Sequence, residues 1–171
     1  KDVRSRVLDL LHGALFRGRM IAQERLESGA DGLDTARLLA AVQNEVISSL
    51  FDFTANRVFG DTKPAGATPL SVLAVGGFGR NVLAPSSDID LLFLKPSKTS
   101  DWAANVVEYV LYMLWDMGLK VGHAFRTVDE CIGLAKEDLN TETALLDARY
   151  ICGNEELFDQ FQTKYKSTLV E

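Results

Sequence analysis

The sequence has few of the residues that build disulfide frameworks, zinc sites or membrane spans. Only two cysteines, Cys131 and Cys152, occur in 171 residues, and they do not form a CxxC pair. This argues against a disulfide framework or a zinc site and favours two reduced thiols. No run of about 18 uncharged apolar residues is present, so we expect no transmembrane helix. Reduced thiols are typical of a cytoplasmic protein, which we expect here. Because charged residues are spread through the N-terminal segment, we also expect no signal peptide.

Basic residues are also in short supply. Lysine and arginine number 18 against 24 acidic residues, which gives a net charge of −6 and a pI near 5.0. General nucleic-acid binding depends largely on phosphate neutralisation by basic side chains, so this balance argues against it. A local basic site for a single nucleotide remains open. The length fits one domain, or one domain with a helical appendage.

The most specific stretch begins with a short apolar run, residues 70–75, that glycines end after six residues. This pattern predicts a buried strand followed by a turn. The turn contains Gly76, Gly77 and Gly79, then Arg80. Glycines let backbone N–H groups approach a ligand closely, as a phosphate-binding loop requires, and an arginine adds a planar cation for phosphate oxygens. A tight strand-to-helix turn explains the glycines alone equally well.

A second predicted strand carries two carboxylates. It covers residues 88–94 and follows a turn that contains Ser86 and Ser87, whose hydroxyls are candidates for phosphate binding. Because strand side chains alternate, Asp88 and Asp90 share one face, with Ile89 on the other. Two unpaired like charges at this spacing favour a cation between them. Mg²⁺ fits best, because it prefers carboxylate oxygens and binds nucleotide phosphates.

The glycine pair, ten intervening residues and Asp88-Ile89-Asp90 together resemble the motif of the polymerase-β-like nucleotidyltransferase superfamily. The string GGFGRNVLAPSSDIDLLFL is most similar to its bacterial PII-uridylyltransferase branch. The resemblance implies an α+β fold, with a small mixed sheet flanked by helices and an N-terminal helical segment. It implies transfer of UMP from UTP to a tyrosine hydroxyl of the PII nitrogen-regulatory protein, with Mg²⁺ held by Asp88 and Asp90.

The remaining chain is predicted to be mostly helical. Apolar spacing predicts helices over residues 1–26, 34–59 and 101–117, a strand over 119–127, and helix from 128 to about 151, interrupted near 138–140, then from 155 to 165. Residues 60–69 and 96–100 are predicted loops, and we expect Trp102 and Trp115 in the core. We expect a helical segment, 1–60, packed on a core, 61–171. A chain that begins without methionine and in a helix is expected to be part of a longer protein.

The sequence departs from the superfamily in one respect. Most members carry a third carboxylate on the strand that follows the long helix, but residues 119–127 contain none, and Gly122 and His123 stand there. Three interpretations follow: a site with two carboxylates, a third carboxylate from elsewhere such as Asp147, or a catalytically weakened domain. His123 is a candidate general base or an ordinary strand residue. Arg126 is a candidate triphosphate contact or a surface ion-pair partner.

Two alternatives to PII uridylylation therefore stay open. One is adenylyl or other nucleotidyl transfer to a different protein or a small molecule. The other is a nucleotide-binding regulatory module without transfer, motivated by the absent third carboxylate.

Overall fold

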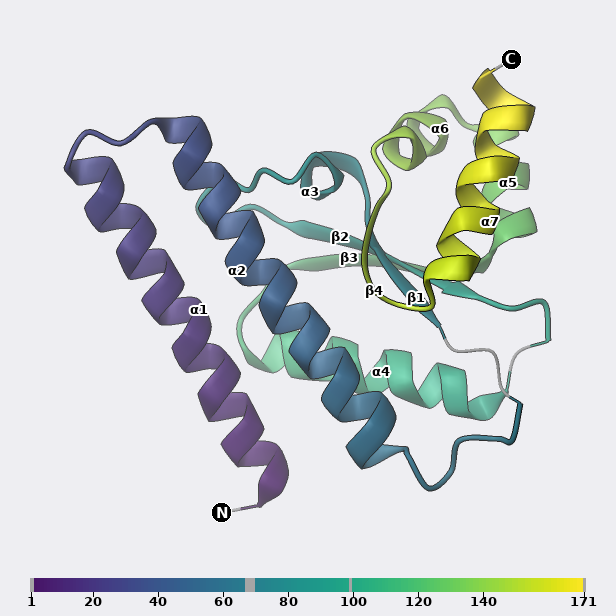
Figure 1. The fold of residues 1–171 in the computed structure, drawn as a ribbon, viewed down its shortest axis with the longest axis horizontal. Helices are drawn as coiled ribbons and strands as arrows, with labels where there is room; N and C mark the ends of the chain where they lie inside the picture. Colours follow the sequence, from purple (N-terminus) through teal and green to yellow (C-terminus); the bar gives the residue numbers. More distant parts are fainter. Residues whose placement is uncertain (1, 67–69, 99, 171) are drawn as a thin grey trace.

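The computed structural model describes residues 2–66, 70–98 and 100–170 as one arrangement of helices around a sheet (Figure 1). The elements are α1 (Val3–Glu27), α2 (Gly32–Phe53), η1 (Thr54–Val58), β1 (Ser71–Ala74), α3 (Gly76–Gly79), β2 (Ile89–Lys95), α4 (Asp101–Asp116), β3 (Val121–Thr127), α5 (Val128–Glu137), α6 (Leu139–Leu146), β4 (Arg149–Gly153), α7 (Glu155–Tyr165) and η2 (Lys166–Val170). None of the described helices combines the length and the apolar character that crossing a bilayer requires. The α+β class predicted from the sequence is confirmed.

The sheet has four strands in the order β3-β2-β1-β4 and is mixed. β1 pairs antiparallel with both β2 and β4, whereas β2 and β3 run parallel. Just beyond β1, the Val75 N–H donates to the carbonyl oxygen of Asp90 at 3.1 Å. The glycine turn that follows Val75 therefore begins directly beside the aspartate strand.

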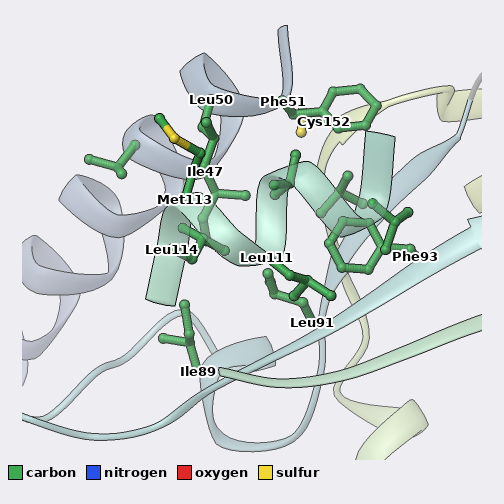
Figure 2. Close-up of a cluster of buried hydrophobic side chains, with 14 of the residues drawn as sticks. Ile47, Leu50, Phe51, Ile89, Leu91, Phe93, Leu111, Met113, Leu114 and Cys152 are labelled. Atoms are coloured by element: carbon green, nitrogen blue, oxygen red, sulfur yellow. The ribbon is translucent and has the colours of Figure 1, made fainter. Parts of the chain in front are cut away.

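Helices cover both faces of the sheet. Ile89, Leu91 and Phe93 face a core built with α2 and α4, whereas Leu92 and Leu94 face a core built with α5, α6 and α7. Figure 2 shows the first core, where α2 and α4 side chains meet the strand residues and Cys152. The predicted strand alternation is thus confirmed for residues 89–94, and it leaves Asp90 on the α5–α7 face.

The two N-terminal helices lie side by side (Figure 1). Asp31 caps α2, because its side chain accepts from the backbone N–H groups of Leu33 and Asp34. Close approach of α1 to α2 depends on Gly18, where an added Cβ would lie 2.6 Å from Val42 Cγ1. Leu15 of α1 and several α2 residues belong to the same core as β2, so this hairpin packs on the sheet.

Two predictions are wrong. Residues 149–153 form β4, where the sequence predicted continued helix, because the free edge of β1 pairs with them and Asn154 N–H donates to Leu70 O at 2.8 Å. Trp115 is 42% exposed and lies outside the core, unlike the buried Trp102. The other helices and strands lie within a few residues of their predicted bounds. The predicted loops at 60–69 and 96–100 fall partly outside the described residues, at 67–69 and 99.

Candidate active site

The centre of the site is the carboxylate of Asp90, which lies between two glycines. Its Oδ2 is 3.5 Å from the position of a Cβ added to Gly76, and an added Cβ at Gly122 would overlap its Oδ1. The β2–β3 register explains the second approach, since Asp90 stands directly opposite Gly122. A side chain at position 122 would displace the carboxylate. Where most members of the superfamily carry a third carboxylate, β3 therefore has a glycine, and the Asp90 carboxylate occupies the space beside it.

Both predicted metal ligands are accessible. Asp88 immediately precedes β2 and Asp90 is its second residue, and both are exposed. Within the described ranges, neither carboxylate has a hydrogen-bond or ion-pair partner, and no group of three or more His, Cys, Asp or Glu side chains forms a metal-binding cluster. Two free carboxylates at the start of one strand fit a Mg²⁺ ion that keeps waters and phosphate oxygens as its other ligands.

The glycine turn forms a single short helical turn, α3. Gly76 has φ of +57°, a conformation that glycine adopts without strain, and Gly79 packs against the backbone of Asp147 so closely that an added Cβ would overlap it. The strand-to-helix turn expected as the simpler alternative is thus present. Because Gly76 also faces Asp90, the same turn lies beside the carboxylates.

Arg149, which is not among the residues predicted for the site, holds this turn in place. Its guanidinium, half-buried, donates to the carbonyl oxygens of Phe78 (3.0 Å) and Gly79 (3.2 Å) and to Asn44 Oδ1 of α2 (3.2 Å). It also lies 5.3 Å from the Phe78 ring centroid. Burial lowers the pKa of Arg149 from its usual value. The sequence offers one signal for this role, an arginine beside apolar strand-forming residues, but the predicted helix covers that segment.

Two other charged candidates pair with each other. Arg80 Nη1 lies 2.7 Å from Asp147 Oδ2, and Arg80 Nη2 lies 3.6 Å from the position of a Cβ added to Gly77. The Arg80 side chain therefore lies over the glycine turn. Asp147, a candidate third carboxylate, is engaged by Arg80 and is not part of a metal-binding cluster with Asp88 and Asp90 among the described residues.

The other candidates lie around this centre at different distances. His123 points to the face opposite Asp90 and contacts the Trp115 ring, with centroids 5.9 Å apart, so it is not placed as a base beside the carboxylates. Arg126 is on the face of Asp90 but four residues beyond Gly122, roughly 13 Å along β3.

Ser86, at φ of +63°, and Ser87 lie in the loop before Asp88 and line a small cavity of about 30 Å³ with Gln43.

A free carboxylate pair at the start of a central strand, beside a glycine turn on a mixed sheet, fits the polymerase-β-like nucleotidyltransferase class inferred from the motif. No family model matches the chain. Over 170 residues, 99% of its length, the chain is 51% identical to the bifunctional uridylyltransferase/uridylyl-removing enzymes of two Caulobacter vibrioides strains. It is also 51% identical over 168 residues to the enzyme of that name from Phenylobacterium zucineum.

The chain spans 18% of the length of these curated relatives, so it is similar to one domain-sized part of them. The resemblance inferred from the stretch of glycines and aspartates is confirmed, and it extends over nearly the whole chain.

Proposed function

We propose that this chain is a nucleotidyltransferase domain that moves UMP from UTP to a tyrosine hydroxyl of the PII protein and releases pyrophosphate. The observation that carries the proposal is the pair of unpartnered, exposed carboxylates of Asp88 and Asp90, with Asp90 beside the Gly76 turn. The 51% identity to enzymes named for uridylyl transfer supports the choice of UMP. Two free buried thiols fit a reducing, cytoplasmic location. Residues 1–60 would serve as a helical segment packed on the core of residues 61–171.

Each site residue has a proposed role that follows from its position. The Gly76 turn presents backbone N–H groups to the triphosphate, with Arg80 beside it and with Ser86, Ser87 and Arg126 as outer contacts. Asp88 and Asp90 would hold Mg²⁺, which supplies charge neutralisation for the reacting phosphates. Arg149 keeps the turn against α2 and so fixes the distance between phosphate and carboxylates.

The transfer needs no reactant other than UTP and the acceptor tyrosine. The tyrosine oxygen forms a bond to the α-phosphorus, the bond to the bridging oxygen of the β-phosphate breaks, and pyrophosphate leaves with that electron pair. The phenolic proton passes to solvent at the exposed carboxylates, since His123 faces away. Catalysis by the protein is then mainly positioning and electrostatic stabilisation.

The test is transfer of labelled UMP to purified PII protein in Mg²⁺, with pyrophosphate release measured in parallel. Wild-type protein should transfer from UTP and not from ATP, and Asp88→Asn should abolish transfer while keeping the fold. Preference for ATP would instead indicate adenylyl transfer to another acceptor.

A second candidate, a nucleotide-binding regulatory module, is favoured by the absence of a third carboxylate near Asp88 and Asp90 in the described part of the chain. It predicts UTP binding without pyrophosphate release, even when the acceptor is supplied. Transfer by the wild-type protein would rule it out.

A further inference from the structure

β3 is a free edge of the sheet, and it lies next to the carboxylates. It pairs only with β2 in the order β3-β2-β1-β4, and Gly122 and His123 are exposed. Ile89 N–H donates to Lys120 O, so the even-numbered residues of β3 bond with β2. The backbone N–H and C=O groups of Val121, His123 and Phe125 then point away from the sheet. Such an edge can accept another strand.

A strand added at this edge would bring a side chain to Asp90. Neighbouring residues in paired strands share a face, so the residue opposite Gly122 would project on the side that carries the Asp90 carboxylate. Two strand spacings place its Cα about 10 Å from that of Asp90, within reach of a long side chain. Gly122 has no side chain to block the path, and Asp90 Oδ1 already leans over it.

The surroundings of the edge suit an extended peptide with acidic residues. On the opposite face, Tyr112, Trp115 and His123 form an edge-to-face aromatic row, with Tyr112 52% and Trp115 42% exposed. Residues 119–127 contain Lys120 and Arg126 but no acid, in a chain of net charge −6. Lys120 immediately precedes β3 and Arg126 lies near its end, and the alternation of strand side chains puts both on the face of Gly122.

We propose that the acceptor protein docks by adding an extended, acidic segment to the free edge of β3, with its acceptor tyrosine opposite Gly122. An acidic residue two positions from that tyrosine would then lie opposite Lys120, and a neighbouring side chain would pack on Trp115. This inference rests on the proposed function, because it identifies how the acceptor reaches the same carboxylates.

Residue-resolved amide exchange with and without PII protein tests the strand addition directly. Val121, His123 and Phe125 should become protected when PII protein binds, at least tenfold, whereas Gly122 and Ala124 are already protected by β2. Unchanged exchange at the odd-numbered amides, in a protein that still transfers UMP, would overturn the docking proposal and leave the proposed function intact. Failure of wild-type transfer would count against the proposed function itself.

A matched pair of variants isolates the backbone contact. His123→Pro removes one outward N–H, which an edge strand tolerates, whereas His123→Ala keeps that N–H and removes only the ring. We expect KM for PII protein to rise at least tenfold in His123→Pro and at most about threefold in His123→Ala, with UTP affinity unchanged in both. Equal effects of the two substitutions would contradict strand addition.

Two further readouts complete the test. If His123→Pro also loses UTP binding, the variant is misfolded, and the wild-type exchange pattern decides the question. Lys120→Glu should raise KM for PII protein about fivefold at low ionic strength and less at high salt, because it reverses the charge that faces the acidic segment. An unchanged KM would contradict the acidic character of that segment.

Discussion

The two ends of β2 have opposite environments. From Leu91 to Leu94 every side chain is at most 1% exposed, and helices cover both faces. Immediately before Leu91, Asp90 is exposed, and its carboxylate, like that of Asp88, has no hydrogen-bond or ion-pair partner among the described residues. The buried half anchors the strand, and the open half presents carboxylates on a backbone that is paired with a strand on each side. A rigid element of this kind positions catalytic groups more accurately than a loop does.

The two ends of β2 differ in exposure because their neighbouring residues differ. At the buried end, Leu92 and Leu94 meet side chains of α5 and α7. At the open end, Asp90 meets Gly76 and Gly122, which have no side chains. The lack of side chains on these two neighbours leaves space around the Asp90 carboxylate, as the proposed metal site requires.

The largest effect on activity should come from removing the charge of Asp90 at the open end of β2. Asp90→Asn should lower UMP transfer roughly 1,000-fold, because it removes a charge needed for the metal, and should change unfolding free energy by less than about 0.5 kcal/mol. Leu92→Ala, two residues away on the same face, should instead cost about 2–5 kcal/mol of stability. Activity assays and urea unfolding of both variants test this. A large stability loss in Asp90→Asn would show that the Asp90 carboxylate also supports the fold.

A smaller effect should follow when the space beside Asp90 is filled. Gly122→Ala places a Cβ where Asp90 Oδ1 lies, so the carboxylate must rotate, and we expect transfer to fall about 100-fold. The matched control is Gly133→Ala in α5, where an added Cβ meets nothing within 4 Å. That substitution should leave transfer unchanged and add up to about 1 kcal/mol of stability. Equal activities of the two variants would show that Asp90 tolerates a neighbour.

Loosening the glycine turn should have a more moderate effect. Arg149→Met keeps the apolar bulk but loses the hydrogen bonds to Phe78, Gly79 and Asn44, which should raise KM for UTP about tenfold. The same change leaves the Gly79 carbonyl oxygen without the Arg149 donor and should cost about 1–3 kcal/mol. Steady-state kinetics and thermal unfolding measure both. A KM equal to that of the wild type would show that the turn keeps its position without Arg149.

The smallest effect concerns two thiols buried in the two cores that flank the sheet. Burial raises the pKa of the Cys131 and Cys152 thiols to about 12, on opposite faces of the sheet. The unfolded chain releases these protons near pH 9 and the folded chain keeps them, so their stabilisation is complete below pH 9 and is lost as pH rises toward 12. Roughly 1 kcal/mol per thiol should be gone by pH 10.

Urea unfolding at several pH values measures this loss. A variant with both Cys131→Ala and Cys152→Ala should show a flatter dependence on pH above 9. An identical dependence in the two proteins would mean that the thiols ionise as freely in the fold as in the unfolded chain.

Local patterns in the sequence predicted much of the fold and the centre of the site. Strand alternation placed Asp88 and Asp90, helical periodicity gave α1, α2, α4 and α7, and Asp138 was correctly predicted to interrupt the helix, where it caps α6. The exposed Trp115 and the strand β4 were missed. No glycine or proline separates residues 141–149, so local propensity favoured helix, and the unpaired edge of β1 decided otherwise.

The candidates for the chemistry could be chosen from the sequence, because spacing along one strand and a glycine turn are local properties of the chain. Their surroundings depend on contacts between parts of the chain that are far apart in the sequence. Arg149 reaches Phe78 and Gly79 from about 70 positions away, Arg80 pairs with Asp147, and Gly122 stands beside Asp90 through the β2–β3 register. These contacts depend on how the strands pair and the helices pack, and hydrophobic burial across the whole chain sets that arrangement.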